Sequence, residues 1–66
     1  MTVTITIKCD NAAFDHCGDE VSRILRRLTE HIGTAGLWER EHFDELHKHP
    51  LMDFNGNRVG SVTVSE

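Results

Sequence analysis

The sequence predicts a single small α+β domain over residues 1–66, with a strand, two helices and two further strands in that order (βααββ). Residues 2–8 alternate strictly between polar and apolar side chains, and residues 19–32 place apolar side chains at helical spacing. Asn55-Gly56 separates two short runs as a hairpin turn does. We therefore expect a three-stranded, mostly antiparallel sheet with one long and one short helix packed on one face.

The first element is a strand over residues 2–8, built mainly from β-branched residues that favour extended backbone. Val3, Ile5 and Ile7 share one face, whereas the threonines and Lys8 share the other. We expect the Val and Ile face to be buried and the threonine face to meet solvent.

A loop is predicted over residues 9–18, with Phe14 packing back onto the core. The long helix follows over residues 19–32, because carboxylates in a first turn favour a helix start, and Gly33 is expected to end it. Its apolar stripe comprises Val21, Ile24, Leu25, Leu28 and Ile32, and its polar side carries Arg23, Arg26, Arg27 and Glu30.

A shorter helix is predicted from Leu37 or Trp38 to Lys48, ending ahead of Pro50. The residues expected to face inward are Trp38, Phe43 and Leu46. The opposite side holds a run of carboxylates, Glu39, Glu41, Asp44 and Glu45.

A hairpin is predicted around Asn55-Gly56, between strands at residues 51–54 and 57–64. A type I′ turn needs positive φ at both central residues, and Asn-Gly tolerates that conformation. An isolated hairpin is marginally stable, so we expect the first strand to join it, lying beside the last strand.

A β-bulge is predicted at Gly60. Val62 and Val64 share one face of the last strand, whereas Val59 is out of phase with them. Glycine at this break in the pattern is typical of such a bulge.

The composition argues against several classes of function. Eleven carboxylates against seven Lys and Arg give a formal charge of −4, which disfavours unaided binding to nucleic acid. A chain of 66 residues has little room for both a core and a buried substrate cleft, so we do not expect an enzyme. No leader pattern or apolar membrane span is recognised, and we expect a cytoplasmic protein with reduced thiols.

The cysteines and histidines do not match a known catalytic or metal-binding spacing. Cys9 and Cys17 are too far apart in sequence for a structural zinc knuckle. A composite site with His47 and His49 is conceivable, but solvated histidines and thiols that pack as small apolar groups are the expected outcome. A nucleophilic role for Cys17 beside His16 lacks an orienting third group. We therefore expect no metal, no cofactor and no catalytic residue.

Two charged surfaces are candidates for partner binding. The first is the acidic run, which can imitate nucleic-acid phosphates toward a basic protein groove. The second is the Arg23, Arg26 and Arg27 face of the long helix, which would suit a small nucleic-acid-binding or regulatory protein. Both also fit ordinary solvated helix faces. The residues expected to contact a partner are Glu39, Glu41, Asp44, Glu45, Asp19 and Glu20.

Three segments resemble small phage- and prophage-encoded proteins that include anti-CRISPR proteins against type I systems. The segments are the opening Thr-Val-Thr-Ile-Thr-Ile-x-x-Asp-Asn-Ala-Ala-Phe, the Glu-Val-x-Arg-Ile-Leu-Arg helix start and the closing Asn-Gly-Asn-Arg-Val-Gly-x-Val-Thr-Val. The resemblance is weakest over residues 33–50.

This resemblance implies a non-enzymatic inhibitor that binds a subunit of a CRISPR surveillance complex in the bacterial host and blocks recognition of target DNA. Its acidic surface would act as a DNA mimic, with no direct contact to nucleic acid or membrane. We expect a monomer more than a dimer, although an exposed strand edge leaves a dimer open.

Overall fold

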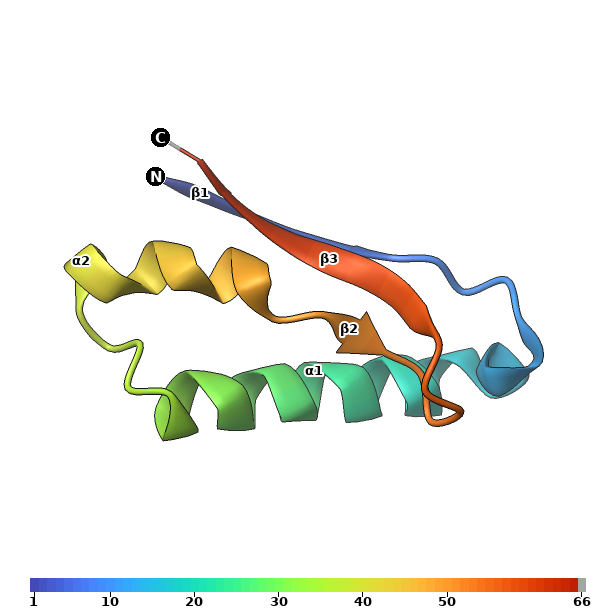
Figure 1. Ribbon diagram of the computed structural model, residues 1–66. Helices are drawn as coiled ribbons and strands as arrows, with labels where there is room; N and C mark the ends of the chain where they lie inside the picture. The colour runs from blue at the N-terminus through green and yellow to red at the C-terminus, as the bar shows by residue number, and fades with distance from the viewer. Residues whose placement is uncertain (66) are drawn as a thin grey trace.

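The three strands form one antiparallel sheet in the order β1-β3-β2, in a computed structural model that describes residues 1–65 (Figure 1). Strand β1 spans Thr2–Ile7, β2 spans Leu51–Met52 and β3 spans Arg58–Ser65. The expected position of the first strand beside the last is confirmed. The α+β class with a three-stranded antiparallel sheet and one long and one short helix is confirmed as well.

The expected bulge lies in β3. Leu51 pairs with Gly60 while Met52 pairs with Arg58, so Val59 is the extra residue. As a result Val59 and Val62 both reach the core. A Cβ at position 60 would lie 2.0 Å from the carbonyl oxygen of Thr6, so only glycine lets β1 approach this closely.

The hairpin turn differs from the expected type I′. Among residues 1–65, positive φ occurs only at glycines, so Asn55 does not adopt it, whereas Gly56 has φ of 85°. The Asp53 N–H donates to the Asn57 carbonyl at 2.9 Å and the Gly56 N–H to the Asp53 carbonyl at 3.0 Å. This is the pattern of a three-residue loop closed by one left-handed glycine. The strand before it is correspondingly short: β2 ends at Met52, because Asp53 closes the loop and Phe54 lies within it.

The long helix α1 spans Cys17–Thr34, so it begins earlier than expected and does not end at Gly33. The residue that ends it is Gly36, which has φ of 70°. The Leu37 N–H donates to the Ile32 carbonyl at 3.1 Å and the Gly36 N–H to the Gly33 carbonyl at 3.4 Å, which together form a Schellman cap. Two glycines lay near the expected end, and the cap geometry selects the second.

The expected second helix is divided into the α-helix α2 (Arg40–Phe43) and the 3₁₀ segment η2 (Asp44–Lys48). The expectation that Trp38 faces inward is wrong, because 74% of this residue is exposed. The buried residue is instead Leu37, which the Schellman cap turns toward the core. Leu46 is buried as expected and Phe43 is partly buried.

The core lies between the helical segments and the sheet. In Figure 1 the segment α2–η2 and α1 lie on the same side of the β1–β3 ribbon, where η2 packs against β3 while α1 packs against β2 and the 3₁₀ turn η1 (Ala12–Phe14). The long helix is thus not the segment that lies on β3. The buried apolar residues are Ala13, Phe14, Ile24, Leu28, Leu37, Leu46, Leu51, Val59 and Val62.

The apolar face of β1 is only partly covered, contrary to expectation. Val3 and Ile5 remain 41% and 42% exposed, although they pair with Val64 and Val62 on β3. The reason is that the helical layer stops at β3. Within the described part of the chain, no helix combines the length and apolar character needed to span a bilayer.

Candidate interaction surface

The acidic run lies on the surface of α2 and η2. Glu39, Glu41, Asp44 and Glu45 are all exposed. Glu39 occupies the N-cap position of α2 with extended backbone, and Glu41 lies in the first turn. Both positions favour carboxylates, because unpaired N–H groups give a helix start a partial positive charge. The helix start thus suits Glu41 and Glu39, although the Glu39 side chain makes no cap hydrogen bond, and all four carboxylates are left to solvent.

Some of these carboxylates have basic neighbours. An Oε1 atom of Glu41 lies 3.7 Å from Nε2 of His42, and Oε1 of Glu45 lies 3.7 Å from Nζ of Lys48. These are exposed contacts of little energetic weight. Within residues 1–65 no ion pair involves Glu39 or Asp44. The run therefore keeps carboxylates available for an external cation.

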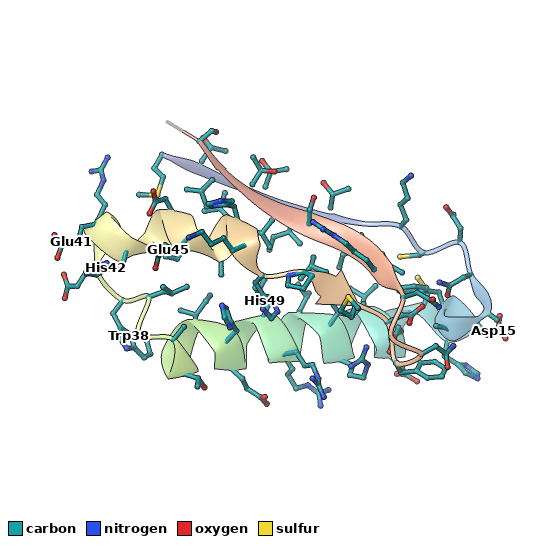
Figure 2. The ribbon with its side chains drawn as sticks, viewed as in Figure 1. Asp15, Trp38, Glu41, His42, Glu45 and His49 are labelled. Atoms are coloured by element: carbon teal, nitrogen blue, oxygen red, sulfur yellow. The ribbon has the colours of Figure 1, made fainter. Side chains whose placement is uncertain are left out.

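Trp38 lies next to the acidic run and is the most exposed large apolar residue of the described chain. Its ring edge borders Gly33, where an added Cβ would lie 3.6 Å from Cζ2 and 3.7 Å from Cη2. Figure 2 shows Trp38, Glu41 and Glu45 at the same end of the molecule, where α1 ends and α2 begins. We call the group Trp38, Glu39, Glu41, Asp44 and Glu45 the acidic–aromatic surface.

The other two carboxylates expected to contact a partner do not belong to this surface. Asp19 is exposed but lies in the first turn of α1, whereas Trp38 follows the other end of that helix (Figure 2). Eighteen helical residues separate the two ends of α1 by about 27 Å. Glu20 is only 5% exposed, so its carboxylate faces the interior.

Glu20 connects the helix to the hairpin. Arg23 donates to it twice, from Nε at 2.7 Å and from Nη2 at 3.0 Å, and the Phe54 N–H donates at 2.8 Å. Arg23 Nη2 also donates to the Met52 carbonyl at 2.9 Å. The hydrogen bonds from Arg23 lower the pKa of Glu20 below its ordinary value, and burial opposes them. The Glu20–Arg23 pair therefore stabilises the fold, and its charges cancel.

A second buried carboxylate, Asp53, organises the hairpin loop. It is 3% exposed and accepts the N–H groups of Asn55 and Asn57, both at 2.9 Å. The side-chain amides of Asn57 and Asn11 donate to its other oxygen at 3.2 and 2.8 Å. Burial alone raises the pKa of Asp53, but these donors outweigh it and lower the pKa below its ordinary value.

This role of Asp53 was not predicted from the sequence. The signal for it was the spacing Asp-x-Asn-Gly-Asn, because an Asp side chain that accepts the N–H two residues later forms an Asx turn.

The arginine cluster presents less free charge than the sequence suggests. Arg23 is occupied by Glu20, as described above. Arg26 Nη2 donates to the Ser22 hydroxyl at 3.1 Å, and Arg27 is exposed. Of the three expected phosphate-binding cations, the two that carry uncompensated charge are therefore Arg26 and Arg27.

A surface hollow of about 480 Å³ lies between α1 and β2, lined by Arg23, Arg27, His49, Met52 and Phe54 among others. Its buried carboxylate, Asp53, has both oxygens engaged by hydrogen-bond donors, and Arg23 is paired. The residues that line the hollow thus include no nucleophilic side chain with a basic group beside it. This geometry therefore gives no support to the hollow as a substrate-binding active site.

The two cysteines and two of the five histidines, His31 and His49, have close neighbours of their own kind. Cys9 and Cys17 are exposed free thiols. The pKa of the Cys9 thiol is raised, first by local desolvation and then by the neighbouring Cys17 thiol, and a raised pKa opposes nucleophilic activation. His31 and His49 stack with ring centroids 4.2 Å apart. Within residues 1–65 no three His, Cys, Asp or Glu residues are arranged to hold a metal ion.

Comparisons with protein-family models, with curated proteins and with solved structures found no match to this chain.

Proposed function

We propose that this protein is a non-enzymatic inhibitor that binds a basic, nucleic-acid-binding groove of another protein through its acidic–aromatic surface. The observation that carries this proposal is the 74% exposure of Trp38 at the same end of the molecule as the exposed carboxylates of Glu41 and Glu45 (Figure 2). The resemblance of the strand, helix and hairpin segments to anti-CRISPR proteins makes a type I CRISPR surveillance complex the first partner to test.

The two components of the surface make different contributions. An exposed tryptophan beside a charged rim is a frequent energetic centre of protein interfaces, because its large ring fills an apolar pocket on the partner. The carboxylates supply charge complementarity to Lys and Arg, which accelerates association and excludes acidic surfaces. A groove that binds DNA phosphates offers the complementary cations.

The proposal is tested by competition for DNA. A purified type I surveillance complex is mixed with labelled target DNA, and the concentration of this protein that blocks DNA binding is measured. Trp38→Ala is expected to raise that concentration at least ~30-fold, as a tryptophan at an interface centre does. The quadruple variant Glu39→Gln, Glu41→Gln, Asp44→Asn, Glu45→Gln is expected to raise that concentration at least ~10-fold at low salt, and the inhibition that remains through Trp38 is expected to depend little on salt.

The matched control removes the same number of charges elsewhere. Asp10→Asn, Asp15→Asn, Asp19→Asn and Glu30→Gln change exposed residues outside the acidic–aromatic surface. This control is expected to inhibit within about threefold of the unmodified protein, since distant screened charges contribute little. If both quadruple variants lose inhibition equally, net charge and not this surface is responsible.

The alternative, a nucleic-acid-binding regulator that uses the arginine face of α1, is separated by one further variant. Arg26→Glu with Arg27→Glu would abolish a mobility shift of DNA or RNA by this protein alone, at low salt. In the inhibitor proposal no such shift occurs, and the double variant still blocks DNA binding by the surveillance complex.

A further inference from the structure

Strand β1 is an edge of the sheet, and one side of its backbone is unused. The Lys8 N–H donates to the Val59 carbonyl at 2.8 Å, and the Thr6 carbonyl oxygen faces Gly60. Backbone groups alternate in direction along an antiparallel strand. The even-numbered residues therefore pair with β3, and Val3 and Ile5 direct their N–H and C=O groups to the open edge.

The side chains of the same two residues are also uncovered. Val3 and Ile5 lie on the core side of the sheet, opposite Val64 and Val62, yet each is about two fifths exposed. They are uncovered because η2 packs on β3 and leaves β1 at the margin. The edge thus presents unpaired hydrogen-bonding groups and apolar side chains together.

This edge lacks the features that usually prevent strand pairing. Natural edge strands carry charges, prolines or bulges, or are very short. Residues 2–7 contain no charged residue and no proline, and the register from Thr2 opposite Ser65 to Ile7 opposite Gly60 is unbroken. Six β-branched residues with a free edge form a template for another strand.

We propose that β1 pairs antiparallel with β1 of a second copy of this chain, about a twofold axis at Thr4. Val3 of each copy then lies opposite Ile5 of the other, and the outward backbone groups of both residues exchange hydrogen bonds. Thr4 meets its own counterpart on the solvent face, a favourable cross-strand pair.

The strand pattern selects this pairing. A shift by one residue would set Val3 against Thr4, whose backbone groups point back to β3, and would mix apolar with polar side chains. A twofold axis at Ile5 would set Lys8 of each copy against Thr2, whereas the axis at Thr4 leaves Lys8 outside. Because the strand pattern is self-complementary, we expect a second copy of this chain to bind the open edge of β1. Pairing with a strand of another protein is the alternative that the test distinguishes.

The resulting sheet has six strands, in the order β2-β3-β1 from one copy followed by β1-β3-β2 from the other. A twofold axis perpendicular to the sheet keeps the helices of both copies on the same side, so Val3 and Ile5 of both copies form one apolar strip between them. Pairing along one short strand buries less surface than the roughly 1,200 Å² of a stable interface, so we expect a dissociation constant on the order of 10–100 µM. This dimer changes the expectation of a monomer drawn from the sequence.

Site-directed cross-linking tests the axis, in a background in which Cys9 and Cys17 are replaced by serine. Thr4→Cys places two thiols opposite each other at a spacing of about 4.5–5.5 Å between Cα atoms, which suits a disulfide. Mild oxidation is expected to convert most of this variant to a covalent dimer. The control Thr2→Cys lies opposite Thr6, about 13 Å from its own counterpart along the strand, and stays monomeric.

Sedimentation equilibrium over roughly 5–500 µM measures the unlinked dimer. Val3→Pro removes an outward N–H that β3 does not use, so it is expected to abolish the dimer while the circular dichroism spectrum stays unchanged. A monomer at every concentration overturns the proposal, as does equal cross-linking of Thr2→Cys and Thr4→Cys. Capture of a foreign protein's strand in place of the second copy also overturns it.

Discussion

Replacing Gly60 with alanine would put a methyl group 2.0 Å from the carbonyl oxygen of Thr6 and 3.1 Å from the carbonyl carbon of Thr6 and from Cα of Ile7. An ordinary contact between carbon and oxygen is about 3.3 Å or longer. The clashing atoms belong to the backbone of β1, so no side-chain rotation relieves the contact, and the strands must separate by more than about 1 Å. We therefore expect overpacking and weakened pairing between β1 and β3.

The cost combines two contributions. Overpacking in a tight site costs about 1–3 kcal/mol, and loss of a strand hydrogen bond such as Lys8 N–H to Val59 adds about 1 kcal/mol. A domain of this size has a free energy of unfolding of about 3–10 kcal/mol, so a loss of about 3 kcal/mol removes a large part of it. The melting temperature is expected to fall by roughly 15 °C.

Thermal and urea unfolding followed by circular dichroism measure this loss, with Gly18→Ala as the control. Gly18 lies in the first turn of α1 with no atom within 4 Å of an added Cβ, and alanine favours a helix by about 1 kcal/mol. The control is therefore expected to be as stable as the unmodified protein or more so. A melting temperature of Gly60→Ala within a few degrees of the unmodified protein would refute the close approach of β1.

Further outcomes follow from the buried groups. Leu46, 1% exposed, is expected to lose about 2–5 kcal/mol of unfolding free energy on change to alanine, measured by urea titration. Burial, and then a stacked histidine, lower the pKa of His49 below its ordinary 6.5, so the folded state binds fewer protons than the unfolded chain as pH falls below that value. Stability should therefore decrease between about pH 7 and pH 5, and His49→Gln should flatten this part of the profile. The pKa values of Glu20 and Asp53 are lowered from 4.5 and 3.8, so their stabilisation is complete above those values and is lost as pH falls through the folded pKa values. Glu20→Gln should lower the melting temperature without weakening partner binding at temperatures where the variant is folded; weaker binding at an unchanged melting temperature would return Glu20 to the interface.

The local periodic signals in the sequence predicted the fold well. Strict alternation placed β1 almost to the residue, and the phase change around Gly60 indicated the bulge that brings Val59 into the core. Both signals depend on side-chain direction, which backbone geometry determines directly. The same reasoning placed the long helix, apart from its ends.

The errors occur where a tertiary contact or a side-chain hydrogen bond overrides a local preference. Asn55 is suited to a type I′ turn, but the buried Asp53 carboxylate binds the following N–H groups and sets a different loop. Helical spacing assigned Trp38 to the core, but the cap at Gly36 starts a new chain direction before it. Neither effect has a signature in periodicity alone.

The candidate site was predictable only in part. The acidic run was visible as composition, and its exposure agrees with that prediction. The burial of Glu20 was not visible, because carboxylates are common in the first turn of a helix and only the hairpin loop brings Phe54 over this one. The uncovered edge of β1 depends on where the helical layer stops, which no local pattern specifies.

Net charge therefore describes the exposed surface of this protein poorly. Two carboxylates lie inside the fold, and one arginine is neutralised there, so the surface that a partner meets depends on which charges remain outside. Near the acidic–aromatic surface Arg40 and His42 interrupt the run of carboxylates, and Trp38 supplies the apolar area that charge cannot. The proposed function therefore requires a partner that offers both cations and an apolar pocket. A plain polycation such as polylysine satisfies only the first requirement, so we expect it to compete weakly and to lose all competition at moderate salt, whereas binding to the specific groove persists through Trp38.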